Sequence, residues 1–244
     1  MRYAIISDIH ANLEAFQAVL AMIADLKVDK TLCLGDITGY NANPNECIEI
    51  IRRENIVCIM GNHDSRSCGL ESPGNVNALA RRAILWTSEQ LTPASKEFLA
   101  SLPRELRVEA FFLFHGSIHN TDSYIFTKHD LKENFALLES LKGSPHIGFF
   151  GHTHMKVLFS FRDDVLAVEL PEAHTITELN RYLINPGSVG QPRDGDSRAS
   201  FLVYDTRENN VTFHRVDYNI NEAQRKIISA GLPAKLAERL SRGW

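Results

Sequence analysis

The sequence has no hydrophobic run long enough to cross a bilayer and no amino-terminal segment patterned like a secretory signal peptide. It has only four cysteines and no Cys-x-x-Cys pair, which argues against a zinc knuckle or a thioredoxin-like redox motif. It also lacks a basic excess, since its formal net charge is -4. These absences predict a cytoplasmic globular protein with reduced thiols, and they argue against a nucleic-acid polymer or a membrane as the partner.

The length of 244 residues suits one large domain or two small ones. No repeat, low-complexity tract or linker interrupts the sequence, so we predict a single domain over residues 1–244. A chain of this length can bury most of its surface without disulfides. We therefore expect Cys33 and Cys58, which lie in apolar runs, to be small core residues.

The first third of the sequence alternates between strands and helices. Apolar residues at helical spacing follow Asn12, the expected N-cap, and predict a helix to about Leu26. Strands near 30–34 and 56–60 enclose a second helix, which begins at Asn43-Pro44-Asn45. This βαβαβ order predicts a parallel sheet with helices on its faces.

The last third of the sequence is mostly extended. Five segments there are predicted to be strands, over 157–161, 165–170, 181–184, 199–204 and 211–216. Two short helices are expected after about residue 221. The fold class predicted from these elements is α/β, with two mixed β-sheets packed as a sandwich and flanked by helices.

Five short polar patches each follow an apolar run, as strands do when they run into loops. They read Asp8-Ile9-His10, Gly35-Asp36, Gly61-Asn62-His63-Asp64, His115-Gly116 and Gly151-His152-Thr153-His154. This order predicts that one edge of a sheet gathers carboxylate, imidazole and amide groups. Such an edge is where a metal-dependent enzyme builds its site.

The spacing within these patches suits metal binding. Asp8 and His10 lie two residues apart at the end of a strand, as do His152 and His154. If the extended geometry continues, the two side chains of each pair leave the same face and can reach one ion. The carboxylate of Asp36 has two oxygens and can bridge two cations.

Seven residues are candidate metal ligands: Asp8, His10, Asp36, Asn62, His115, His152 and His154. Imidazole together with carboxylate suits Mn, Fe, Zn, Ni or Co better than calcium. Seven ligands exceed what one ion needs, so two divalent or transition metal ions that share Asp36 fit better. Paired metals about 3.5–4 Å apart clamp the attacking and leaving oxygens of an in-line displacement, and they lower the pKa of bound water from about 15.7 towards 7. The prediction is phosphoester hydrolysis by a metal-bound hydroxide.

His63, Asp64 and Arg193 are further candidates for the site. His63 lies in the same loop as Asn62, so a protonated imidazole there could donate to the leaving oxygen, for a gain of roughly 10²–10⁴-fold. Asp64 would orient that imidazole, or it is a simple turn acid. Arg193 is a candidate substrate-binding residue, because arginine pairs well with phosphate oxygens, and a surface salt bridge is its alternative.

The ordered blocks D-x-H, G-D, G-N-H-D/E, H and G-H-x-H resemble the pattern of the calcineurin-like metallophosphoesterase superfamily, and the match spans residues 8 to 154. The resemblance implies a two-sheet sandwich flanked by helices, with His63 as the proton donor. It implies two ligand sets: Asp8, His10, Asp36 and His154 for one metal, and Asp36, Asn62, His115 and His152 for the other.

Within that superfamily, the chain looks like the small prokaryotic branch related to diadenosine tetraphosphatase and to phosphodiesterase-like proteins. The similarity lies in residues 35–40, 44–47 and 185–193. Gly39, Tyr40 and Asn41 stand where serine/threonine phosphatases and dinucleotide tetraphosphatases read D-R-G. The arginine that grips a phosphate and the aspartate that supports the histidine are both missing from that place. This departure favours a singly charged phosphodiester, which needs less positive charge than a monoester dianion.

The sequence leaves several alternatives open. One is a phosphomonoesterase, a serine/threonine protein phosphatase or a dinucleotide polyphosphate hydrolase. Another is a non-catalytic scaffold of the same fold. Because His63 and all seven candidate ligands are present, the leading prediction is a hydrolase that acts on a small phosphorylated substrate.

Overall fold

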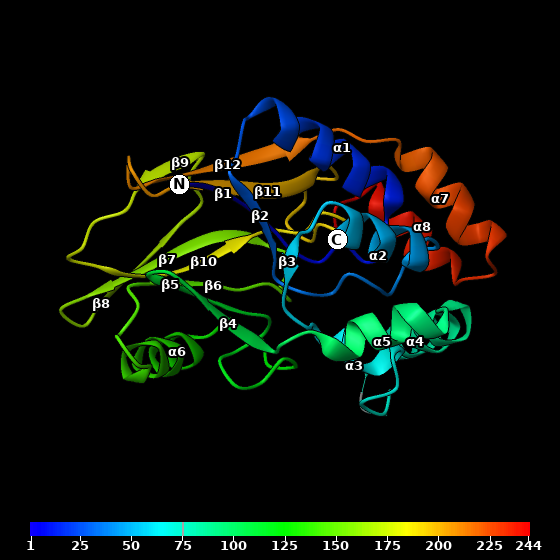
Figure 1. Cartoon of the computed structure of the whole chain (residues 1–244), viewed down its shortest axis with the longest axis horizontal. Helices are drawn as coiled ribbons and strands as arrows, with labels where there is room; N and C mark the ends of the chain where they lie inside the picture. The colour runs from blue at the N-terminus through cyan, green and yellow to red at the C-terminus, as the bar shows by residue number, and fades with distance from the viewer. Residues whose placement is uncertain (75) are drawn as a thin grey trace.

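A computed structural model of the chain describes residues 1–74 and 76–244. Two six-stranded sheets pack face to face, and the helices lie outside them (Figure 1). The strand order is β3-β2-β1-β11-β12-β9 in the first sheet and β4-β5-β6-β10-β7-β8 in the second. Each sheet contains both parallel and antiparallel pairs. The predicted α/β sandwich of two mixed sheets is therefore confirmed.

The first sheet begins with the predicted βαβαβ unit. Its strands are β1 (Arg2–Ile6), β2 (Lys30–Cys33), β3 (Val57–Cys58), β9 (Ala173–Thr175), β11 (Ala199–Asp205) and β12 (Asn210–Val216). β1, β2 and β3 are parallel, and α1 (Leu13–Asp25) and α2 (Pro44–Arg53) connect them. The side chain of Asn12 accepts a hydrogen bond from the backbone N–H of Ala15, which confirms it as the N-cap of α1.

The second sheet places three parallel strands at its centre. Its strands are β4 (Glu105–Val108), β5 (Phe111–Phe114), β6 (Ile147–Phe149), β7 (Lys156–Arg162), β8 (Val165–Glu169) and β10 (Arg181–Pro186). β5, β6 and β10 are parallel, whereas β4, β7 and β8 pair antiparallel. The helix α6 (Lys128–Ser140) connects β5 to β6 on the outer side of this sheet (Figure 1).

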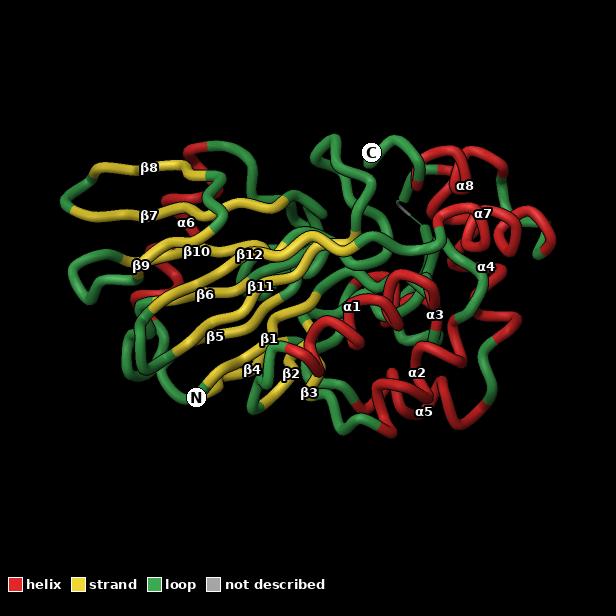
Figure 2. The backbone as a smooth tube through the Cα atoms, turned by 90° about the horizontal axis from the view of Figure 1, so that it is seen from above, coloured by secondary structure: helices red, strands yellow, loops and turns green. Residues whose placement is uncertain are grey.

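The other five helices of the described residues gather beyond one end of the strands (Figure 2). They are α3 (Asn62–Ser67), α4 (Ala78–Gln90), α5 (Pro93–Ser101), α7 (Ile220–Ser229) and α8 (Ala234–Leu240). Asn62, His63 and Asp64 were expected in a loop, but they form the first turn of α3. The carboxylate of Asp64 accepts a hydrogen bond from the N–H of Gly61 at 3.1 Å, which stabilises the helix start. None of the helices in the described part of the chain is long and apolar enough to span a bilayer.

Successive side chains along each strand point to opposite faces of the sheet, so they pack into two separate layers of the core. Tyr3 and Ile5 of β1 pack between the two sheets, whereas Ala4 and Ile6 belong to the layer beneath α1 and α2. Cys33 and Cys58 lie in that second layer as free, buried thiols, as expected. The β-strands therefore form an apolar core, and the polar residues of the candidate site lie just beyond the ends of the strands.

The loop after β10 packs against the loop after β1 at this end of the strands. The N–H groups of Val189 and Gly190 donate to the carbonyls of Ser7 and Asp8, both at 2.9 Å. The close approach requires glycine at position 190, because an added Cβ would lie 1.8 Å from the carbonyl oxygen of Ile9. This loop therefore fixes the backbone from which Asp8 projects.

We expect Gly190→Ala to lower the free energy of unfolding by more than about 2 kcal/mol, because backbone atoms, not a flexible side chain, meet the added methyl group. Urea unfolding followed by circular dichroism measures the change. Gly74→Ala is the matched control, since its Cβ would meet only the hydroxyl of Ser72, at 3.6 Å. Equal stability of the two variants would contradict this account of the loop.

Candidate metal centre

The seven predicted ligands meet where loops leave the parallel strands of both sheets. Asp8 and His10 follow β1, Asp36 follows β2 and Asn62 follows β3. The other three follow β5 and β6 of the second sheet: His115, His152 and His154. None of the seven is more than 6% exposed. The fold therefore buries a set of acids, imidazoles and one amide that the sequence distributes over 147 positions, from residue 8 to residue 154.

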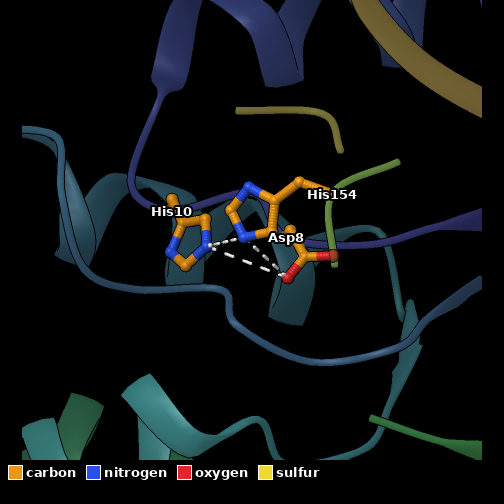
Figure 3. Close-up of side chains that lie close together, drawn as sticks. All are labelled: Asp8, His10 and His154. Carbon is orange, nitrogen blue, oxygen red and sulfur yellow. Dashed lines mark hydrogen bonds and ion pairs between the residues drawn. The ribbon is translucent and has the colours of Figure 1, made fainter. Parts of the chain in front are cut away.

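Asp8, His10 and His154 form the first group (Figure 3). The Nε2 atoms of His10 and His154 lie 3.0 Å apart. Oδ1 of Asp8 lies 3.4 Å from Nε2 of His154 and 3.8 Å from Nε2 of His10. Three potential ligand atoms thus face a common point.

Asp36, His115 and His152 form the second group. Nε2 of His115 lies 3.3 Å from Oδ2 of Asp36 and 3.2 Å from Oδ1 of Asn62. The same oxygen of Asp36 lies 3.6 Å from Nε2 of His10, in the first group. Asp36 therefore stands between the two groups, in the place that a shared ligand would need. The role of these residues as ligands stays a prediction.

Backbone carbonyls orient the imidazoles. The Nδ1 atoms of three rings are paired with carbonyl oxygens, in the pairs His10–Thr38 (2.9 Å), His115–Leu34 (2.7 Å) and His154–Gln191 (2.6 Å). In the neutral tautomer that satisfies these carbonyls, Nδ1 carries the proton and Nε2 presents a lone pair to the centre. His115 reaches this state only when it loses the second proton that the charge of Asp36 stabilises. His152 is turned the other way, since its Nε2 donates to the carbonyl of Asp122 at 3.1 Å. Such outer hydrogen bonds are typical of imidazoles that bind metals.

The loops reach the centre through left-handed backbone. Five of the seven residues have positive φ: Asp8 (54°), His10 (50°), Asp36 (52°), His152 (65°) and His154 (59°). The expectation that the extended geometry continues through Asp8 and His10 was therefore wrong. The sheet pairing of β1 ends before them, and the N–H groups of both donate instead to carbonyls of the neighbouring loop at Gly35 and Asp36. Strain of this kind costs about 1–3 kcal/mol per residue and clusters at functional sites.

The buried charges fit a cation. Oδ2 of Asp36 has no hydrogen-bond partner among the residues described. Burial alone would raise the pKa of Asp36, but the neighbouring imidazoles of His115 and His63 hold it well below its usual range. Burial lowers the pKa of both His10 and His154 well below the usual range, so these rings are neutral and able to bind a metal. A carboxylate oxygen beside imidazole nitrogens matches the donor set of a transition metal site.

His63 lies against this centre. One of its nitrogens lies within 4.8 Å of ligand atoms of His10 and Asp36. Burial lowers the pKa of His63 to about 4. Its Nδ1 is buried and has no hydrogen-bond partner within the described ranges. A Cβ at Gly39 would lie 2.4 Å from that nitrogen, so the ring occupies the space that an aspartate at position 39 would require.

The carboxylate of Asp64 acts on the backbone. It accepts hydrogen bonds from the N–H groups of Ile37 (3.2 Å), Thr38 (3.0 Å) and Gly61 (3.1 Å). It also accepts one from the hydroxyl of Thr38 at 3.0 Å. These contacts fix the loop after β2 to the start of α3. Asp64 was predicted either to orient the ring of His63 or to be a simple turn acid. The observed contacts act on the loop that carries Asp36, and an influence of Asp64 on the ring stays a prediction.

A cavity of about 300 Å³ opens beside the centre. Its lining includes Arg193, whose Nη2 donates to Oε1 of Gln191 at 3.1 Å and whose guanidinium lies 5.7 Å from the ring centroid of Tyr40. No ion pair of the described residues involves Arg193, so the surface salt bridge considered for it is not observed. Binding of a substrate phosphate by Arg193 stays a prediction.

Sequence reasoning missed Arg66 and Asp122, which also line the cavity. Their side chains form a bidentate pair with both N–O distances at 2.8 Å, and Arg66 also donates to the carbonyl of Asn62. Asp122 is the residue whose carbonyl accepts from His152. Arg66 lies one helical turn after Asn62, so recognition of α3 would have placed it on the same face. Nothing in the sequence pattern marks Asp122.

Comparisons with known proteins agree with this geometry. The sequence model of the calcineurin-like phosphoesterase superfamily domain matches residues 1–209. An uncharacterized protein of Methanocaldococcus jannaschii is 37% identical over 246 residues, which cover 98% of this chain and 97% of that protein. The crystal structure of a metallophosphoesterase from Sphaerobacter thermophilus has 38% sequence identity and a TM-score of 0.86, with 100% of this chain and 99% of that chain covered. The fold also matches a hypothetical protein of Pyrococcus horikoshii, at 22% identity and a TM-score of 0.82, with 100% and 98% covered.

Metal binding should release protons at neutral pH. Burial alone would lower the pKa of His115, but the charge of Asp36 outweighs it and raises the pKa to about 10. A cation must displace the proton that His115 holds below that pH, so the affinity should rise with pH between 6.5 and about 10, by about tenfold per unit. Calorimetric titration with Mn²⁺ in buffers of different ionisation enthalpy measures the release, which we expect to be about one proton or more.

His115→Gln should lose this proton release. The control is His119→Gln, which alters an exposed ring paired with Glu105 outside the centre. Mn²⁺ binding by the unaltered protein without proton release, or with affinity that falls as pH rises, would contradict the charge state assigned to His115 and Asp36.

Proposed function

We propose that this chain, which belongs to the calcineurin-like phosphoesterase superfamily, is a metal-dependent phosphodiesterase. Residues 1–244 would act as one domain. The family suggests a hydrolase of phosphoric esters that acts on a small phosphorylated substrate. The observation that carries the finer proposal is the position of Asp36. Its unpartnered Oδ2 lies between two groups of ligand atoms and beside a cavity that contains Arg193.

Two metal ions would occupy the two groups. Asp8, His10, Asp36 and His154 would hold one ion, and Asp36, Asn62, His115 and His152 the other. This mixture of imidazole, carboxylate and amide suits Mn, Fe, Zn, Ni or Co. When bound, such ions supply positive charge to the transition state and acidify water to a hydroxide nucleophile. The orientation of the rings by carbonyls supports this arrangement, since it leaves lone pairs facing inward.

His63 would protonate the leaving oxygen. The ring lies at the wall of the cavity and in reach of the same ligand atoms. With its pKa at about 4, the ring is neutral at pH 7 until an anion enters the cavity. The substrate phosphate would supply that negative charge and stabilise the protonated ring. Asp64 would serve the site by fixing the loop that carries Asp36.

The charges around the cavity favour a diester over a monoester. Arg66 is neutralised by its bidentate pair with Asp122, so its charge is already compensated. Arg193 would bind a non-bridging oxygen of the substrate. One uncompensated guanidinium beside the centre suits a singly charged phosphate better than a dianion. His63 and the complete ligand set support an enzyme over a non-catalytic scaffold.

The diester preference can be measured with two substrates that share a leaving group. We expect kcat/KM for bis(p-nitrophenyl) phosphate to exceed that for p-nitrophenyl phosphate by about tenfold or more in Mn²⁺, because the cavity provides charge for a monoanion. A chelator should abolish both activities. A tenfold preference in the other direction would favour a phosphomonoesterase, and no turnover with any of several metals would count against hydrolysis altogether.

We expect His63→Ala to lower kcat for the diester by about 10²–10⁴-fold, because the leaving oxygen loses its proton donor. Metal content, measured by mass spectrometry of the purified protein, should stay unchanged. His129→Ala is the control, since this ring is exposed on α6 and does not line the cavity. Unchanged turnover in His63→Ala would remove this residue from the mechanism.

A further inference from the structure

The ring of Tyr40 lies at the wall of the cavity, beside the candidate metal ligands. Tyr40 lines the cavity and is 5% exposed. Its ring centroid lies 4.6 Å from that of His10 and 4.5 Å from that of His63. The guanidinium carbon of Arg193 lies 5.7 Å from the same centroid. Because a cation within about 6 Å of an aromatic centroid is attracted to the face of the ring, Tyr40 and Arg193 form a cation–π pair at the cavity.

The C-terminal helices hold this ring in place. Tyr40 belongs to a buried apolar cluster that also contains Ala83 of α4, Ile227 of α7 and Leu236 of α8. Both α7 and α8 lie beyond residue 209, where the match to the superfamily model ends. The imidazoles of His10 and His63 confine the ring from the side of the metal centre. The face that Tyr40 presents to Arg193 is therefore fixed before any substrate binds.

The side chain of Arg193 has few other partners. Its backbone is fixed, since its N–H donates to the carbonyl of His154 at 3.1 Å. Its Nη2 donates to Oε1 of Gln191 at 3.1 Å, whereas its buried Nε has no hydrogen-bond partner among the residues described. Ordering a long side chain costs conformational entropy. The amide of Gln191 and the face of Tyr40 are contacts that offset this cost.

We propose that Tyr40 is a positioning residue, whose ring holds the guanidinium of Arg193 at the cavity and thereby raises the affinity for the substrate phosphate. This role rests on the proposed function, because it requires a phosphate to bind beside Arg193. Tyr40 acts through Arg193 and not on the reacting atoms. The attraction comes from the aromatic face, so the hydroxyl of Tyr40 is dispensable. An aliphatic side chain at position 40 would keep the charge of Arg193 but would let the guanidinium leave the cavity.

Binding of inorganic phosphate to the full-length, Mn²⁺-loaded protein tests this role, and a double-mutant cycle isolates the contribution of the pair. We expect Tyr40→Leu to raise the Kd measured by calorimetry by about fivefold to tenfold, and Tyr40→Phe to keep it within about twofold. In the Arg193→Gln background, Tyr40→Leu should cause no further change. Phe98→Leu is the matched control, since its ring faces the guanidinium of Arg52 at 5.9 Å outside the cavity, and it should leave the Kd unchanged.

The proton resonances of Arg193 provide a readout that is independent of phosphate. The ring current of Tyr40 should shift the Hδ resonances of Arg193 upfield, and Arg193→Gln identifies these resonances by their loss. The shift should disappear in Tyr40→Leu and persist in Tyr40→Phe. Circular dichroism and Mn²⁺ content check that each variant is folded. Tyr40→Met is a second aliphatic variant, because its flexible side chain fills irregular space that Leu does not fit.

Additive effects of Tyr40→Leu and Arg193→Gln on the Kd, or Arg193 resonances without an upfield shift in the unaltered protein, would overturn the positioning role. An equal loss of affinity in Tyr40→Phe and Tyr40→Leu would also overturn it, since the hydroxyl would then be the active group. Hydrolysis of bis(p-nitrophenyl) phosphate with additive effects would reject the positioning role alone. Non-additive effects without hydrolysis would reject the phosphodiesterase alone, and absence of phosphate binding by the unaltered protein would reject both.

Discussion

The fold at this end of the molecule depends on one buried anion, the carboxylate of Asp36. A buried charge is costly unless a partner compensates it. Here one oxygen accepts from the N–H of His63 and the other faces two imidazoles without a hydrogen bond. The proton on His115 supplies the compensation in the absence of metal, and a cation would supply it more strongly. The charge of Asp36 thus couples the protonation state of the surrounding histidines to metal binding at the centre.

The surrounding structure resists collapse of this centre. Strand ends from both sheets contribute to it, so no single hairpin can rearrange alone. The loops are bonded to one another, through Asp64 between the β2 loop and α3, and through Gly190 between the β10 loop and the β1 loop. These contacts stabilise left-handed residues that a free loop would avoid. Loop-to-loop hydrogen bonds therefore hold the centre in addition to the sheets.

Sequence order predicted the convergence of the ligands because parallel strands must end at one edge. It did not predict how they converge, since nothing in Asp8-Ile9-His10 signals left-handed backbone. It missed α3 because its six residues are all polar and show no apolar period, and Arg66 was missed with it. Asp122 was missed for a different reason: its partner lies 56 residues away, and no local pattern records such a pair. Charge pairing across loops is decided by tertiary packing alone.

Main-chain atoms, at Leu34, Thr38 and Gln191, hold three of the imidazoles in one tautomer. A side-chain acceptor disappears when its codon changes, but a carbonyl is present whichever amino acid occupies the position. Proton placement on these rings is therefore insulated from substitution at all three places, provided that the backbone path is kept. Substitutions at these three positions should leave the protonation of the imidazoles unchanged. Selection would act instead on residues, such as Gly190, that fix the course of the backbone.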